Sequence, residues 1–315
     1  MLKRTIITSL VITLFAAMLF AADPAEKPGL LILTHGSPSP NWQASIAKLA
    51  EKVSALNETK KTFHAVTAAN MEFAKPDTAD GIAALEKAGC DRIIVVPAFI
   101  CPTSHTHFDV PAALGIYSST QTRKGMKEEN VKPASPHVPI MVTQTISEGD
   151  LLDRYVRDEI AALSEKPEEE AVLLIAHGDE DHAGLVEPVM RRLLVEAVGS
   201  KGITKGDWAF CEVGQSYSRN VIPEIRRLAG EKKRVLVVGF YLVSSAKSID
   251  KIGTMMGQSG RRPGGQEGGE KKPPLDGIDV RFSENGVINH PETPQWVLQS
   301  AAEALDTVKT ETASK

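Results

Sequence analysis

The chain has 315 residues, a formal net charge of −4 and 42% hydrophobic residues. This length suits two domains, and the ordinary mixture of apolar and charged residues excludes a disordered or fibrous protein. The slightly acidic balance argues against a nucleic-acid-binding protein. Three cysteines without a C-x-x-C pair exclude a disulfide framework and the common zinc and dithiol redox motifs.

The first 22 residues have the three-part layout of a secretory signal peptide. Lys3 and Arg4 precede an uncharged apolar run over residues 5–20, and Ala21-Ala22 follows it. The run is shorter than the roughly 20 residues that a membrane-spanning helix needs, so cleavage is favoured over retention as an anchor. We therefore expect an exported, periplasmic protein, which contacts the membrane only through residues 1–22 if they are not cleaved.

Residues 23–163 alternate between strand and helix patterns. Continuous apolar runs predict buried strands at residues 29–37, 92–100 and 139–142, and another strand ends near residues 69–73. Apolar residues at helical spacing predict three helices: one that begins after Ser37, one over residues 81–88 and one over residues 151–163. Strands that alternate with helices indicate a parallel sheet, and the last of these helices is expected to close the first domain.

The rest of the chain repeats this plan at a nearly constant shift of 140 to 142 residues. In the repeat, His35, Glu72 and His105 correspond to His177, Glu212 and Lys247. Such a shift indicates a duplicated α/β unit. We expect two tandem domains, residues 23–163 and 171–315, joined by a polar linker at residues 164–170. Residues 257–274, rich in Gly and Pro, predict a loop inserted in the second copy.

His35, Glu72 and His105 each lie at or just after the end of a predicted strand. Ligands of open parallel sheets gather beyond the carboxyl ends of the strands, so these side chains are expected to converge. Two imidazoles and a carboxylate suit Co²⁺, Fe²⁺, Ni²⁺ or Zn²⁺, and three protein ligands leave positions open for a substrate. Imidazole also accepts protons near neutral pH, and the Glu72 carboxylate is expected to raise its pKa above 6.5. Insertion of a metal into a macrocycle needs both properties, because each M²⁺ displaces two pyrrole protons.

Other polar residues have both a functional and a structural interpretation. His107 is a spare ligand or an exposed side chain, and residues 179–182 are a metal site or an acidic first helical turn. Cys101 and Cys211 are buried thiols or a bridge formed in an oxidising compartment. A histidine phosphatase is disfavoured, because Thr34 precedes His35 where those enzymes carry an arginine.

Three segments, residues 31–37, 71–76 and 95–105, together resemble the class II tetrapyrrole chelatases, and the CbiX-like sirohydrochlorin cobaltochelatases most of all. The resemblance implies two chelatase-like α/β domains with a crevice between them. It also implies insertion of Co²⁺, or of Fe²⁺ or Ni²⁺ as in relatives, into sirohydrochlorin or a related tetrapyrrole without a nucleotide. By this resemblance His35 and His105 are the metal-binding and proton-accepting histidines, and Glu72 is the acidic residue.

The second half matches the family less completely. His177 and Glu212 are retained, but Lys247 stands where the second histidine would be, so this copy is interpreted as a degenerate site. Lys247 could instead pair with a substrate carboxylate, and Ser37 is the other expected substrate contact. The alternative function is a non-catalytic periplasmic carrier of a metal or a haem-like tetrapyrrole, for which the same residues would serve.

Overall fold

The computed structural model describes residues 26–103, 105–178, 183–199, 201–212, 216–259 and 273–313. The predicted signal peptide, the acidic segment at residues 179–182 and residues 260–272 of the predicted inserted loop lie outside these ranges. Within the described ranges, no helix combines the length and the apolar character that a membrane span requires.

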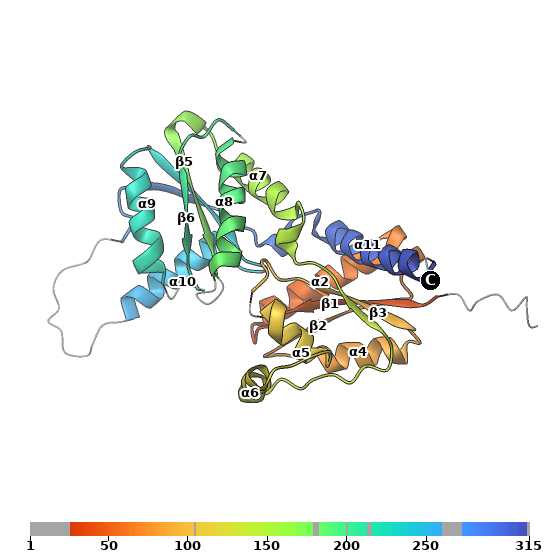
Figure 1. Cartoon of the computed structure of the whole chain (residues 1–315). Helices are drawn as coiled ribbons and strands as arrows, with labels where there is room; N and C mark the ends of the chain where they lie inside the picture. The colour runs from red at the N-terminus through yellow and green to blue at the C-terminus, as the bar shows by residue number, and fades with distance from the viewer. Residues whose placement is uncertain are drawn as a thin grey trace, which may run out of the picture.

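Two parallel sheets of four strands each form the framework of the molecule (Figure 1). The first has the order β2-β1-β3-β4 and consists of β1 (Pro28–Thr34), β2 (Ala65–Asn70), β3 (Arg92–Pro97) and β4 (Ile140–Val142). The second has the equivalent order β6-β5-β7-β8 and consists of β5 (Glu170–Ala176), β6 (Gly206–Phe210), β7 (Arg234–Phe240) and β8 (Asp279–Phe282). The predicted α/β class and the repeated plan are therefore confirmed.

Helices flank both sheets, as expected for parallel strands joined by crossover connections. Their bounds are α2 (Pro40–Ala55), α3 (Asn57–Thr62), α4 (Thr78–Lys87), α5 (Val110–Ala113), α6 (Thr120–Glu128), α7 (Leu151–Leu163), α8 (Ala183–Gly199), α9 (Ile222–Ala229), α10 (Ala246–Ser259) and α11 (Thr293–Ala313). The predicted helix at residues 151–163 coincides with α7.

One hydrophobic core runs through both halves. Successive side chains of a strand point to opposite faces of the sheet. Leu30 and Ile32 of β1 accordingly belong to a buried cluster that continues into the second half through Val172 and Leu174 of β5. Leu31, on the other face of β1, belongs to a separate outer cluster. The two halves are thus held together by continuous apolar packing.

The closing helices are exchanged between the halves. Helix α7 packs on α8 and β7 of the second sheet, whereas the C-terminal helix α11 packs on α2 and β3 of the first (Figure 1). Tyr155 of α7 is fully buried and donates its hydroxyl hydrogen to the carbonyl oxygens of Gly239 and Asn285. This packing differs from the expectation that α7 closes the first half, because buried acceptors for Tyr155 lie on the second.

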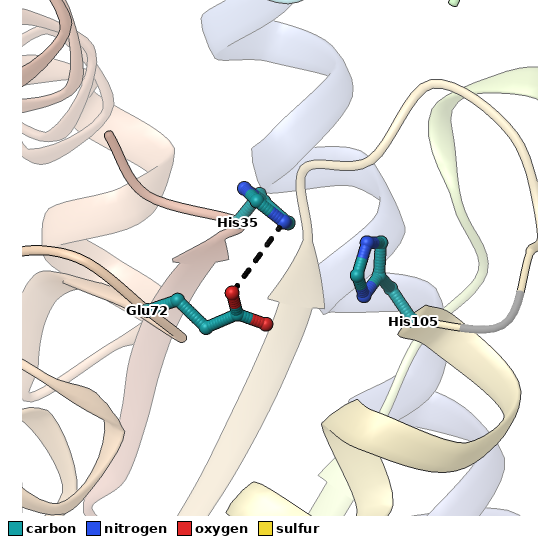
Figure 2. Close-up of side chains that lie close together, drawn as sticks. All are labelled: His35, Glu72 and His105. Carbon is teal, nitrogen blue, oxygen red and sulfur yellow. Dashed lines mark ion pairs between the residues drawn. The ribbon is translucent and has the colours of Figure 1, made fainter. Parts of the chain in front are cut away.

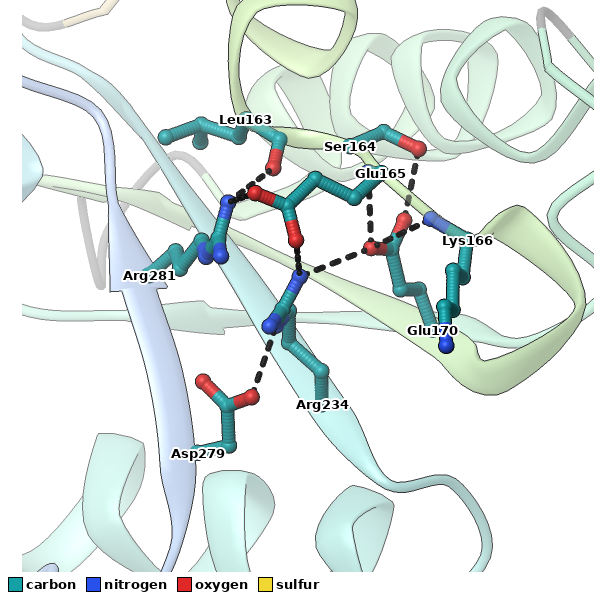
Figure 3. Close-up of polar contacts among 8 residues, drawn as sticks. All are labelled: Leu163, Ser164, Glu165, Lys166, Glu170, Arg234, Asp279 and Arg281. Carbon is teal, nitrogen blue, oxygen red and sulfur yellow. Dashed lines mark hydrogen bonds and ion pairs between the residues drawn. The ribbon is translucent and has the colours of Figure 1, made fainter.

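The segment expected to be a linker is anchored to the second sheet (Figure 3). Glu170, its last residue, is buried and accepts hydrogen bonds from the backbone N–H groups of Glu165 and Lys166. The Glu165 carboxylate lies 2.9 Å from Arg234 of β7 and 2.8 Å from Arg281 of β8. Residues 164–170 therefore connect two packed elements of one structural unit.

Candidate metal centre and cavity

The ends of β1 and β2 hold His35 and Glu72 side by side. Hydrogen bonding continues beyond the two strands, with the Glu72 N–H donating to the His35 carbonyl oxygen at 2.8 Å. Gly36 makes this approach possible, because its φ is +102° and a Cβ atom there would lie 2.0 Å from the Glu72 carbonyl oxygen. The glycine of the His-Gly pair is therefore part of the construction of the site.

His105 completes the cluster from the loop region after β3. It begins a π-helical turn, His105–Asp109, where the sequence predicted a loop. The His35 and His105 ring centroids are 4.6 Å apart, and one ligand atom from each of these histidines and from Glu72 lies within 4.8 Å of the others. Figure 2 shows the three side chains converging from separate segments. The structure thus brings together the three residues that the sequence singled out.

Hydrogen bonds leave the same nitrogen of both imidazoles available. His35 Nδ1 lies 3.1 Å from the Gly36 carbonyl oxygen, and His105 Nδ1 lies 2.9 Å from the Asp109 carboxylate. Both contacts favour the tautomer with a proton on Nδ1 and a lone pair on Nε2. A carboxylate behind a ligating histidine is a common support in metal sites, because it fixes the orientation and the tautomer of the ring.

Burial shifts the pKa values in this cluster. Burial above all, with the neighbouring His105, lowers the pKa of His35 to about 4. Burial, with the charge of Glu129, raises the pKa of the Glu72 carboxyl to about 7. Burial lowers the pKa of His105, but the hydrogen bond that His105 donates to Asp109 and the charges of Asp109, Glu72 and Glu129 together outweigh this effect, so the pKa rises. The expectation that Glu72 raises the pKa is wrong for His35, because desolvation outweighs a carboxyl that lies 3.9 Å away.

The polar atoms of the cluster suit a divalent cation. Glu72 is 5% exposed, and its Oε1 atom has no hydrogen-bond partner among the described residues. Such an atom is costly to bury unless a cation or another donor approaches it. Two neutral imidazole nitrogens and one carboxylate oxygen match the preferences of Co²⁺, Fe²⁺ and Ni²⁺.

The cluster opens onto a cavity of about 760 Å³ between the two halves. Ser37 and the aromatic side chains Trp42, Phe73 and Phe99 line it from the first half. His177, Glu212 and Tyr241 line it from the second half. The volume lies within the range of small-molecule binding pockets, and a ligand there would touch both halves.

The second half contributes an incomplete counterpart of the metal cluster. His177 and Glu212 are exposed, and His177 Nδ1 lies 2.9 Å from the Gly178 carbonyl oxygen, as in the His35–Gly36 pair. Lys247 is exposed on the first turn of α10 and forms an ion pair with Glu284. It is not among the described residues that line the cavity, and its role as a substrate contact stays a prediction.

The remaining candidates are not members of the metal cluster. His107 is exposed and does not belong to the described cluster of ligands. Cys90, Cys101 and Cys211 are buried and not disulfide-bonded, so the structure does not form the Cys101–Cys211 bridge.

Sequence reasoning missed two residues beside the metal cluster. Asp109 lies four residues after His105, a spacing that places two side chains on one helical face and could have revealed the pair. Phe73 follows Glu72 directly, and no sequence pattern indicates that its ring lines the cavity.

Solved structures with a similar fold include two chelatases. SirB from Bacillus subtilis, solved with Fe³⁺, superimposes with a TM-score of 0.60 at 17% identity, over 88% of this chain and 95% of SirB. CbiX, described as the terminal enzyme of siroheme biosynthesis in denitrifying bacteria, gives a TM-score of 0.53 at 14% identity, over 88% of this chain and 99% of CbiX. At these identities the likeness establishes the fold alone.

Similar sequences identify the family. The CbiX family model matches residues 29–163. A sirohydrochlorin cobaltochelatase from Methanococcus maripaludis is 35% identical over 88 residues, which are 28% of this chain and 58% of that protein. One from Saccharolobus solfataricus is 33% identical over 101 residues, which are 32% of this chain and 74% of that protein. By the motifs, the paired sheets and these matches, the chain belongs to the CbiX family.

Proposed function

We propose that this chain is a metal chelatase that inserts a divalent ion into sirohydrochlorin or a closely related tetrapyrrole. The observation that carries the proposal is the cluster of His35, Glu72 and His105 at the wall of a cavity large enough for an organic ligand. Three protein ligands leave coordination positions of the ion open, and the macrocycle nitrogens can bind the ion at these positions. The activity of the matched relatives supports the same reaction.

The pKa values of the cluster allow the protons of the reaction to balance. Binding of M²⁺ displaces protons from Glu72, whose pKa is about 7, and from His105, whose pKa is raised. Transfer of M²⁺ to the macrocycle breaks two pyrrole N–H bonds and leaves both ligands free to take up the two protons. A base with a pKa near the working pH is the most effective, so Glu72 and His105 suit this role better than His35.

Co²⁺ is the proposed metal substrate, with Fe²⁺ and Ni²⁺ as alternatives. The Saccharolobus solfataricus relative is a cobaltochelatase, and the structural relative SirB has been solved with Fe³⁺ and with cobalt. Imidazole and carboxylate ligands accept each of these metals, so the donor set itself does not choose among them.

The test is to follow the absorption spectrum of sirohydrochlorin with Co²⁺ and the purified protein. The wild-type protein is expected to accelerate metal insertion over many turnovers, and His105→Ala to remove most of that acceleration. His107→Ala is the matched control, because this exposed histidine lies outside the metal cluster. Stoichiometric binding of metal or tetrapyrrole without turnover would favour the carrier function instead.

We further propose that the protein is exported to the periplasm and that residues 1–22 are removed. The proposal depends on the basic start and the uncharged run over residues 5–20. N-terminal sequencing of the protein from its native cells should begin near residue 23. Recovery of intact Met1 in the membrane fraction would instead mean that the segment is an anchor.

A further inference from the structure

Phe73 has an unusual backbone conformation directly beside the metal cluster. Its φ is +62°, in the left-handed region that residues other than glycine and asparagine rarely occupy. The Ala74 N–H donates to the Glu72 carbonyl oxygen at 2.7 Å, which closes a tight three-residue turn around Phe73. Strain of this kind persists where the surrounding structure enforces it, and it is concentrated at ligand sites.

The turn separates two side chains that follow one another in sequence. Glu72 is buried with its carboxyl in the metal cluster, whereas Phe73 is 61% exposed and its ring lines the cavity. The Phe73 ring centroid lies 5.5 Å from that of His35, so the ring stands beside a metal ligand. A large apolar ring left open to water at such a position has a free face that a ligand can cover.

We propose that Phe73 is the stacking surface for the macrocycle and so positions it against the metal cluster. This inference rests on the proposed chelatase function. A planar conjugated ligand suits the site, because it can cover the exposed phenyl ring in an offset stacked arrangement. Contact with Phe73 keeps that ligand near His35. Because the turn joins Phe73 directly to Glu72, it also fixes the position of the macrocycle relative to the metal cluster. Phe73 is a positioning residue and takes no part in proton or metal transfer.

The experiment measures sirohydrochlorin binding to the metal-free protein by absorption titration, and Co²⁺ binding separately by calorimetry. Phe73→Ala should weaken sirohydrochlorin binding about 10- to 100-fold, the loss typical when an aromatic stacking partner is truncated. Its Co²⁺ affinity should stay within about twofold of the wild type, as for a surface substitution. Phe73→Trp should retain binding because it keeps a flat ring. Phe73→Leu, which is apolar but not planar, should lose most of it.

Two controls separate stacking from effects on folding. Tyr117→Ala removes another exposed aromatic ring, outside the described lining of the cavity, and should leave binding unchanged. Phe73→Gly removes the ring and relieves the positive φ, so the protein should stay folded by thermal denaturation and still lose binding.

The outcomes distinguish this inference from the proposed function. If the wild type binds and metallates sirohydrochlorin and Phe73→Ala binds it equally well, the stacking role is wrong while the chelatase function stands. Full binding by Phe73→Leu, or an equal loss of Co²⁺ and sirohydrochlorin affinity in Phe73→Ala, would also overturn stacking. A wild type that binds sirohydrochlorin without metallating it contradicts the chelatase function only. One that does not bind it at all contradicts both.

Discussion

Replacing Glu72 by Gln should stabilise the metal-free protein at alkaline pH while removing a proposed metal ligand. Burial raises the pKa of Glu72 from 4.5 to about 7. A tenfold change in an ionisation constant corresponds to about 1.4 kcal/mol, so holding this carboxylate ionised in the fold costs about 3 kcal/mol. Glutamine has nearly the same shape and never ionises, so the substitution should recover this free energy.

The direction of the pH dependence follows from the pKa of the Glu72 carboxyl in the folded and in the unfolded chain. Below pH 4.5 the carboxyl is protonated in both the folded and the unfolded chain, so the two proteins should be similarly stable. Between pH 4.5 and about 7 the unfolded chain ionises first, and the wild type loses stability as the pH rises. At pH 8 the Gln variant should be more stable by about 3 kcal/mol, a rise in Tm on the order of 5 to 10 °C.

The assay is denaturation of both metal-free proteins at several pH values, followed by circular dichroism. Glu86→Gln is a control of opposite sign. Burial raises the pKa of Glu86, but the hydrogen bonds from the backbone N–H and the side chain of His137, with the His137 charge and a backbone hydrogen bond from Val138, together outweigh it, so the pKa is lowered. This variant should therefore lose stability relative to the wild type as the pH rises. Equal stability of the wild type and Glu72→Gln at pH 8 would show that Glu72 is not held in a costly ionised state.

Three further predictions concern the metal cluster and its surroundings. Asp109→Asn should weaken Co²⁺ binding about 10- to 100-fold, because His105 loses the carboxylate that orients it, and calorimetry measures the change. Lys247→Ala should change the free energy of unfolding by less than about 1 kcal/mol, since its ion pair with Glu284 is exposed. A large rise in KM for this variant would support its predicted contact with substrate. At limiting Co²⁺, metal binding should fall as the pH drops through about 7, where Glu72 takes up its proton, and excess Co²⁺ should restore it. If the loss of binding at acidic pH does not depend on the Co²⁺ concentration, the assignment of Glu72 and His105 as ligands is contradicted.

The fold class and the three residues of the metal cluster could be predicted from residue patterns in the sequence. Long apolar runs such as the one that forms β1 are typical of strands buried on both faces in parallel sheets, and their alternation with helix patterns indicates α/β architecture. Parallel strands also end at one edge of the sheet, and this topology made the meeting of His35, Glu72 and His105 predictable. The short strand β8 was not predicted, because its four residues are partly exposed and carry no apolar run.

Residue patterns could not predict which helix packs on which sheet. An amphipathic helix such as α7 can cover either sheet, and the buried acceptors for Tyr155 place it on the second one. The pKa of His35 depends on how deeply the assembled cavity removes it from water, which no local pattern encodes. The outward position of Phe73 depends on a local turn after Glu72, and the tertiary hydrogen bond from the Glu72 N–H to the His35 carbonyl oxygen places that turn beside β1. Local residue patterns specify the helices and strands and their order along the chain. The burial of a side chain, its hydrogen-bond partners and its protonation state depend on how distant helices and strands pack together.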